Sequence, residues 1–162
     1  MPITRDDAAS GMLYFLQTHA DAAAVRALVY GGVTNILESG DITAQTIREN
    51  NKARRDAGTV TNVLAITVWD GGEVAGLPDE WRQQVVIRVF DLGNGYRQIR
   101  AARNLLRYLF DDRWLALSDL DGRKQGAVTL RYRGRTGFRQ SRDFGVEFEN
   151  LTFEAYINQE EE

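Results

Sequence analysis

The segment from Gln83 to Phe110 limits the possible folds of this sequence more than any other. It begins with apolar residues on both sides of an extended chain, interrupted by one arginine: Val85, Val86, Ile87, Arg88, Val89 and Phe90. A strand that is apolar on both faces must be covered on both faces. We therefore predict that this strand lies in the centre of a sheet.

A glycine turn, Gly93-Asn94-Gly95, then opens an amphipathic helix over about Tyr96–Phe110. Its apolar residues recur at spacings of three and four: Ile99, Ala102, Leu105, Leu106, Leu109 and Phe110. The other directions carry Arg97, Arg100, Arg103 and Arg107. These arginines form either a solvated helix face or a surface for phosphate or a partner's carboxylates. A dinucleotide-binding fingerprint would need a third glycine at Gln98, which argues against such a site.

Length and composition limit the class of protein. A chain of 162 residues with 43% hydrophobic residues suits one soluble domain, and we expect a single domain over 1–162. No run reaches the roughly 18 apolar residues needed to cross a bilayer, so we expect no membrane partner. Acids precede a short amphipathic segment at the N-terminus, which argues against a signal peptide. The lack of cysteine favours a cytosolic origin.

Charge gives a further indication. The net charge of −3 argues against sequence-specific binding to duplex DNA. Of the 20 basic residues, only Lys52 and Lys124 are lysine. Arginine forms packed, bidentate ion pairs at interfaces better than lysine does. A GC-rich coding genome would enrich arginine as well, so both explanations stay open.

Two helices are predicted near the N-terminus. Thr4, Asp6 and Asp7 can cap a helix over about Arg5–Gln17. A second, shorter helix is expected over about Asp21–Val29, followed by a brief extended piece.

The next segment, about 39–58, is polar. Ile42 and Ile47 are its only large apolar residues, which is too few to anchor a core helix. We predict a mobile loop or projecting arm whose arginines pair with a neighbouring subunit: Arg48, Arg54 and Arg55.

Strands follow the polar segment. The first has alternating apolar residues, Leu64, Ile66 and Val68. The glycine-rich stretch 70–79 then forms a hairpin loop into the strand that starts near Trp81. A further short strand begins near Trp114. These elements predict an α+β fold with a mainly antiparallel sheet packed by helices, a long polar loop or arm, and a frayed tail at 159–162.

The last hairpin can be placed in register from its pattern. Matching the apolar positions of the two arms pairs Tyr132 with Phe144, Leu130 with Val146, and Val128 with Phe148. The same register brings Arg133 opposite Asp143. The apolar positions change from even to odd after Glu149, which predicts a bulge or bend near Asn150.

Residues with catalytic or metal-binding chemistry are scarce. His19 is the only histidine, and its polar context indicates a surface or capping role. The Asp119-x-Asp121-Gly122 motif is typical of a turn, because an EF-hand places its glycine and glutamate elsewhere. Asp111 and Asp112 are adjacent at a helix end and are poorly placed as an acid and base pair. We expect no enzyme activity, no cofactor, and no catalytic or metal-binding residue.

The order of elements resembles a known family over about Val25–Ile157. The stretch VVIRVFD, the helix IRAARNLLRYLF and the closing hairpin RDFGVEFE look like the tail-terminator (tail completion) proteins of long-tailed bacteriophages. This resemblance implies a virion protein at the tail–neck junction, made in the host cytoplasm. It also implies a hexameric ring that joins the tail tube protein to a neck or head-closure protein, with DNA at most passing through its lumen. The polar segment 39–58 departs from the family pattern.

A ring of this kind needs two different, complementary patches on each subunit. The loop from Arg133 to Arg142 has the composition of a docking loop, with one apolar anchor in a polar rim, although an ordinary hairpin loop fits equally. Its candidate interface residues are Arg135, Phe138, Arg139 and Arg142. Two other classes stay open: a head-closure or adaptor connector, and a small nucleic-acid-binding module that uses the helix arginines.

Overall fold

The elements follow one another along the chain in a mixed order of helices and strands. A computed structural model of the protein describes residues 7–58, 61–73, 81–93, 96–118, 124–137, 139–141 and 146–157. The α-helices are α1 (Asp7–Thr18), α2 (Ala23–Leu28), α3 (Ala44–Asp56) and α4 (Arg97–Phe110), with short 3₁₀ helices η1 (Ala20–Ala22), η2 (Gly32–Asn35) and η3 (Ser39–Asp41). The strands are β1 (Ile36–Glu38), β2 (Ala65–Glu73), β3 (Trp81–Asp91), β4 (Trp114–Ser118), β5 (Lys124–Arg135), β6 (Arg139–Ser141) and β7 (Val146–Ile157).

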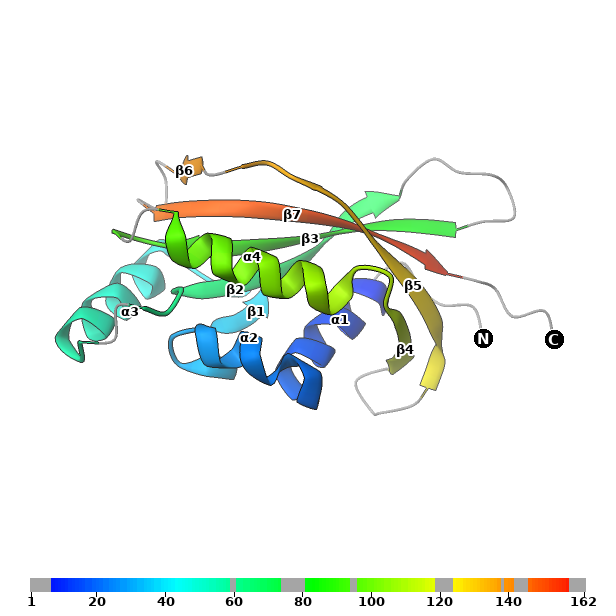
Figure 1. Cartoon of the computed structure of the whole chain (residues 1–162), viewed down its shortest axis with the longest axis horizontal. Coiled ribbons are helices and arrows are strands. Elements are labelled where there is room, and N and C mark those ends of the chain that lie inside the picture. Colours follow the sequence, from blue (N-terminus) through cyan, green and yellow to red (C-terminus); the bar gives the residue numbers. More distant parts are fainter. Residues whose placement is uncertain are drawn as a thin grey trace.

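The strands form one curled sheet in the order β1-β2-β3-β7-β5-β4, with β6 paired to β7 (Figure 1). β1 runs parallel to β2, and the other pairings are antiparallel. The predicted α+β class with a mainly antiparallel sheet is therefore confirmed. β3 lies between β2 and β7, which confirms that the strand apolar on both faces is central.

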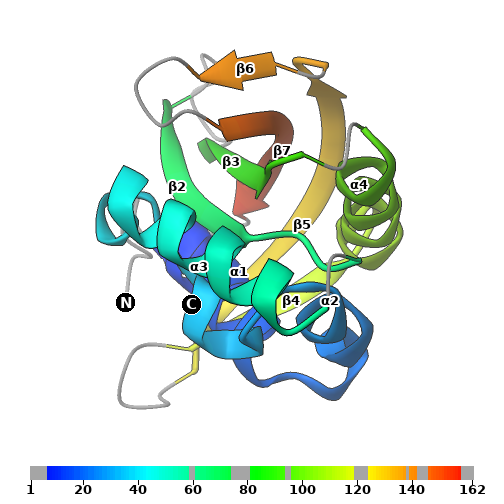
Figure 2. The same cartoon turned by 90° about the vertical axis from the view of Figure 1, so that its left-hand side faces the viewer.

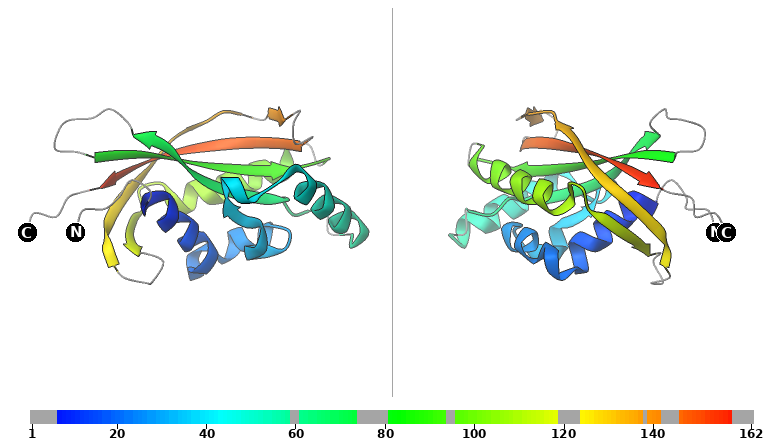
Figure 3. Two further views of the ribbon diagram at one scale, coloured as in Figure 1. Left: turned by 180° about the vertical axis from the view of Figure 1, so that it is seen from behind. Right: turned by 45° about the vertical axis from the view of Figure 1, so that its right-hand side comes forward.

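The main core lies between the sheet and the helices α1, α2 and α4. Figures 1 and 3 show these helices on one side of the sheet, while β4 and β5 bend round toward them. The apolar stripe of α4 is buried as its spacing predicted, with Leu106 and Phe110 fully covered. Large side chains from all these elements meet in this core, including Met12, Leu16, Ile66, Ile87, Ile99 and Phe153.

The other face of β3 is also covered. Phe90 is buried there, and the Arg88 guanidinium lies over the rings of Phe148 and Trp69, at 4.3 and 5.0 Å from their centroids. Arg88 Nε also donates a hydrogen bond to Asn150 Oδ1 at 2.7 Å. Burial lowers the pKa of Arg88. The single arginine of this strand is thus packed against aromatic rings on the face away from the main core.

The polar segment 39–58 differs from its prediction, because most of it is helical. Thr43 caps α3 by accepting a hydrogen bond from the Thr46 backbone N–H at 3.1 Å. Ile42 and Ile47 are both buried, in a second, smaller cluster with Phe90. α3 packs at one end of the sheet and does not project as a loop (Figure 2). Two isoleucines are enough to hold this helix against the sheet because the buried Arg54 also anchors it.

The register of the last hairpin also differs from its prediction. Tyr132 pairs with Phe153 and Leu130 with Ala155, while Val146 pairs with Ser141 of β6. The chain continues past β5 into β6 before it returns, so the ladder is longer than predicted. The apolar face of β5 is the same in both registers, but it meets the odd positions of β7 and not the even positions that were predicted. Both sets of positions are apolar, so apolar matching alone could not separate the two registers.

The predicted bulge near Asn150 is not found in β7, which pairs with β3 without a register shift from Glu147 to Ile157. The irregularity lies in β5, between Tyr132 and Gly134. The change from even to odd apolar positions has another cause. Val146 faces the smaller cluster around α3, whereas Leu151 and Phe153 face the main core.

Candidate assembly surfaces

The few residues with reactive side chains have structural roles where the structure describes them. His19 caps η1, its Nδ1 accepting a hydrogen bond from the Asp21 backbone N–H at 3.0 Å, and its ring stacks on Phe15. The predicted capping role is therefore confirmed. Asp111 accepts a hydrogen bond from the Tyr132 backbone N–H, and Asp112 pairs with Arg131 at 3.1 Å. The motif at 119–122 lies outside the described residues.

Arg54 lies inside the subunit, contrary to its predicted place at an interface. Its side chain is 1% exposed, and its Nη1 lies 2.6 Å from Asp91 Oδ1. The same guanidinium donates to the carbonyl oxygens of Asn62 and Leu92 and to Asn51 Oδ1. These bonds join α3 to the end of β3, so Arg54 stabilises the fold and is not offered to a neighbour.

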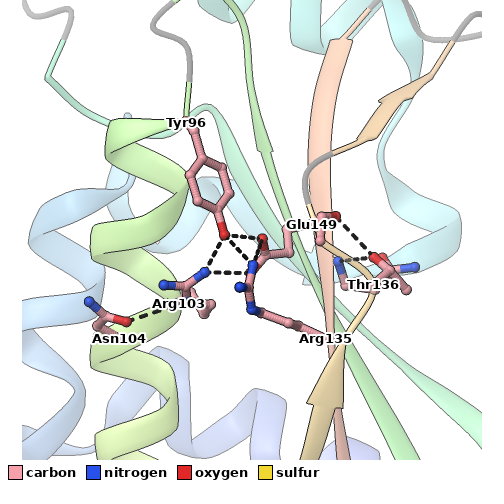
Figure 4. A network of polar contacts seen from close by, with 8 residues as sticks. Tyr96, Arg103, Asn104, Arg135, Thr136 and Glu149 are labelled. Atoms are coloured by element: carbon pink, nitrogen blue, oxygen red, sulfur yellow. Dashed lines mark hydrogen bonds and ion pairs between the residues drawn. The ribbon is translucent and has the colours of Figure 1, made fainter.

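A second polar network surrounds Glu149 and ties β5, β7 and α4 together (Figure 4). The fully buried Glu149 carboxylate accepts a hydrogen bond from the Tyr96 hydroxyl at 2.6 Å and pairs with Arg135 at 3.3 Å. Arg103 also donates to the Tyr96 hydroxyl, and its Nη1 lies 3.6 Å from Glu149 Oε1. Burial raises the pKa of Tyr96, and the hydrogen bond to Glu149 raises it further. Arg135, a predicted interface residue, is therefore partly engaged within its own subunit.

The other predicted interface residues have different surroundings. Arg48 and Arg139 are exposed, on α3 and β6. Arg55 is exposed too, but its guanidinium lies against Gly93, whose φ of +77° forms the turn before α4. Phe138 and Arg142 lie outside the described residues. The structure thus leaves Arg48 and Arg139 as the most accessible of the described candidates.

The four arginines of α4 divide into two pairs. Arg103 belongs to the Glu149 network, and the Arg107 guanidinium stacks over Tyr132 at 4.6 Å from the ring centroid. Arg97 and Arg100 are exposed on the helix surface. No acidic residue occurs in α4, so its outer face is positively charged in an acidic protein. A basic surface for phosphate or carboxylates is therefore available on α4, but Arg103 and Arg107 are engaged within the fold, so it is smaller than the four arginines suggested.

Two grooves flank α1. One, of about 330 Å³, lies against β4 and includes the exposed Tyr14 and Trp114 beside His19 and Arg113. The other, of about 400 Å³, lies against β1 and β2 and includes Leu13, Trp69 and Glu38. We call the second one the Glu38 groove; it is lined by Ala9, Ser10, Leu13, Glu38, Ser39, Gly40, Val68 and Trp69.

Two exposed aromatic residues, Tyr108 and Trp114, were not among the interface residues predicted from the sequence. Tyr108 is 88% exposed and Trp114 62%, although each stands next to the buried part of an amphipathic pattern. The exposure of Tyr108 could have been predicted from the sequence, because this residue lies outside the apolar stripe of its helix. The grooves had no such signal, because their walls come from segments far apart in the sequence.

The sequence matches no protein-family model and no curated protein. A chain of a solved structure described as the virion of a native gene transfer agent (GTA) particle is similar to this chain, with a TM-score of 0.48 and 13% identity over 74% of this chain and 97% of that chain. This likeness is too distant to assign a function. Among the described residues, no helix is long and apolar enough to span a membrane.

Proposed function

We propose that this protein is a structural component of a phage-like virion that assembles into a closed ring, of six subunits, at the end of a tail tube. In this role it joins the tube to the neck and catalyses no reaction. The proposal extends the resemblance of VVIRVFD, IRAARNLLRYLF and RDFGVEFE to tail-terminator proteins. One histidine and no cysteine leave little scope for nucleophilic or zinc chemistry.

The structural observation that carries the proposal is the pair of unlike surfaces on one subunit. The outer face of α4 is basic and presents an exposed tyrosine, whereas the Glu38 groove is concave and acidic. A heterologous interface, the kind from which rings are built, needs two different patches that complement each other. A self-complementary dimer would need only one.

The first test is the state of the purified protein, alone and mixed with assembled tail tubes. Native mass spectrometry and negative-stain imaging should show a ring in solution or a ring bound at the tube end. A protein that stays monomeric in both conditions would exclude the ring. Binding to DNA-filled heads instead of tubes would favour the alternative connector role.

A second test compares two charge reversals, Arg139→Glu and Arg48→Glu. Both side chains are exposed, so each variant should fold like the wild type by circular dichroism. If β6 contacts a neighbouring subunit, Arg139→Glu should weaken ring formation, and if α3 does so, Arg48→Glu should weaken it. Unchanged rings from both would remove β6 and α3 from the interface. Arg135 is unsuitable for this test because its reversal would place a second carboxylate beside the buried Glu149.

A nucleic-acid-binding module remains the second candidate, because Arg97 and Arg100 are exposed on a helix without acids. If these residues neutralise two phosphates, the logarithm of the binding constant should fall with the logarithm of salt with a slope of about −2. Duplex binding of this kind by the monomer, with no self-association, would favour this candidate over the ring.

A further inference from the structure

The outer face of α4 has the composition of a docking surface. Tyr108 is 88% exposed, and it shares this face with Arg97, Arg100, Asn104 and Arg107. We call these five residues the α4 face. Tyrosine and arginine, which both occur on this face, are enriched among the anchor residues that dominate binding at protein interfaces. The exposed Tyr108 ring is therefore accessible to a partner.

The Glu38 groove has the complementary character. Its lining is mixed: Val68, Leu13 and Trp69 supply apolar surface, with Val68 buried and the other two half-buried, and Ser10 and Ser39 supply polar surface. Its rim carries the exposed Glu38, and the exposed Asp41 follows at the end of η3. Within the described part of the chain, no salt bridge is found for either acid. A groove of about 400 Å³ is large enough to admit a tyrosine side chain.

These two surfaces lie on opposite flanks of the subunit. In Figure 2, α4 is on the right-hand side, and the cyan segment that contains η3 is on the left. Figure 3, in its left-hand view from behind, again places β1 and η3 toward the viewer and α4 behind the sheet. One subunit can therefore use both surfaces at once, with a different neighbour on each side.

Charge decides between the two grooves. In the groove against β4, Arg113 is paired with Asp21 at 3.1 Å, so its charge is balanced and the arginines of α4 gain no net attraction there. The Glu38 groove presents carboxylates at its rim to the same arginines. Complementary charge of this kind selects a partner and suppresses the wrong pairing.

We propose that the α4 face of one copy docks into the Glu38 groove of the next copy, with Tyr108 inserted between α1 and β2 and Arg100 paired with the Glu38 rim. The contact is heterologous, so each copy keeps one free α4 face and one free groove until the assembly closes. This inference rests on the proposed ring, since it names the contact by which the subunits would join.

Single-face variants give the first test. Tyr108→Ala with Arg100→Ala should weaken self-association about tenfold or more, and so should Glu38→Lys, as measured by analytical ultracentrifugation. Trp114→Ala is the control, because it removes another exposed aromatic residue, from the other groove. All four positions are exposed, and circular dichroism and urea unfolding should show an unchanged fold.

Mixing the two defective proteins gives the decisive test. The α4-face variant keeps an intact groove, and the Glu38→Lys variant keeps an intact α4 face. One productive contact remains between them, so the mixture should form one-to-one dimers and nothing larger. In a single chain, Arg100→Glu combined with Glu38→Lys should restore association relative to either change alone.

The results that would overturn this contact differ from the results that would refute the proposed ring. Wild-type rings that tolerate both single-face variants, or that fail with Trp114→Ala instead, would overturn this contact and leave the ring itself intact. Loss of duplex DNA binding, without loss of association, in the α4-face variant would assign that face to nucleic acid and also overturn it. A wild-type protein that never associates, alone or beside tail tubes, would refute the proposed function.

Discussion

At the scale of single residues, buried polar side chains add to the stability that the apolar core provides. Arg54 and Asp91 are 1% and 0% exposed and are separated by most of the β2–β3 unit in sequence. Burying either charge alone would be very costly, whereas the pair with its additional hydrogen bonds is tolerated. The polar composition of 39–58 therefore did not prevent a packed helix.

Removing one member of this pair should destabilise the protein strongly. Arg54→Met leaves the Asp91 carboxylate buried without its cation and should lower the free energy of unfolding by about 3–5 kcal/mol. Urea denaturation followed by circular dichroism measures this change. Arg48→Met, on the exposed side of the same helix, is the control and should stay within about 0.5 kcal/mol of wild type. Equal effects from both would show that the Arg54–Asp91 pair is not buried in solution.

Glu147 predicts a pH dependence. Burial, with the nearby Asp91 charge as a second cause, raises the pKa of this carboxyl above its ordinary 4.5. Between the two pKa values the folded state keeps a proton that the unfolded state has lost, so this group makes stability fall as pH rises through that window. Above the window, Glu147 is ionised in both states and its penalty remains.

The variant Glu147→Gln should therefore be more stable than wild type at pH 7, and this advantage should disappear below pH 4.5. Urea midpoints measured at both pH values test the change. Glu49→Gln, at an exposed position on α3, is the control. An advantage that is the same at both pH values would point to packing instead of charge.

At the scale of elements, the Glu149 network explains how a long, curled hairpin is held in place. Arg135 ends β5, Glu149 lies in β7, and Tyr96 and Arg103 belong to the start and the middle of α4. Charge-assisted hydrogen bonds are stronger than neutral ones, and this carboxylate is shielded from water. β5 is therefore fixed to the helix layer at the point where its register shifts.

Arg135→Glu should consequently destabilise the fold, unlike Arg139→Glu four residues along the chain. The lost charge-assisted bonds should cost about 1.5–3 kcal/mol, and repulsion from Glu149 adds to this cost. Thermal unfolding of the two variants at low protein concentration separates them. If both variants unfold like wild type, Arg135 does not bind Glu149 in solution.

At the scale of the whole molecule, unlike surfaces occupy different flanks of one subunit. The sheet has short β1 at one edge of its strand order and β4 at the other, and a groove lies beside each. Helices α1, α2 and α4 cover one face of the sheet, and α3 covers part of the other face. The molecule thus carries a basic helix face on one flank and the Glu38 groove on the opposite one.

Assembly through these flanks should make the apparent stability depend on concentration. A partner that binds only the folded state raises the melting temperature by mass action, so Tm should rise as protein concentration increases. Differential scanning calorimetry at several concentrations measures this effect. The Tyr108→Ala/Arg100→Ala variant should lose the dependence while keeping the Tm of the dilute wild type. A wild-type Tm that does not change with concentration would contradict self-association in this range.

The sequence by itself determined the local elements: the central strand around Ile87, the amphipathic stripe of α4, and the cap formed by His19. Neighbouring residues set these features, since period and capping act over a few positions. Tertiary structure alone decided the burial of Arg54, the pairing of Tyr132 with Phe153, and the walls of the Glu38 groove. Each of these depends on partners far away along the chain, and alternating apolar residues satisfy more than one register equally well.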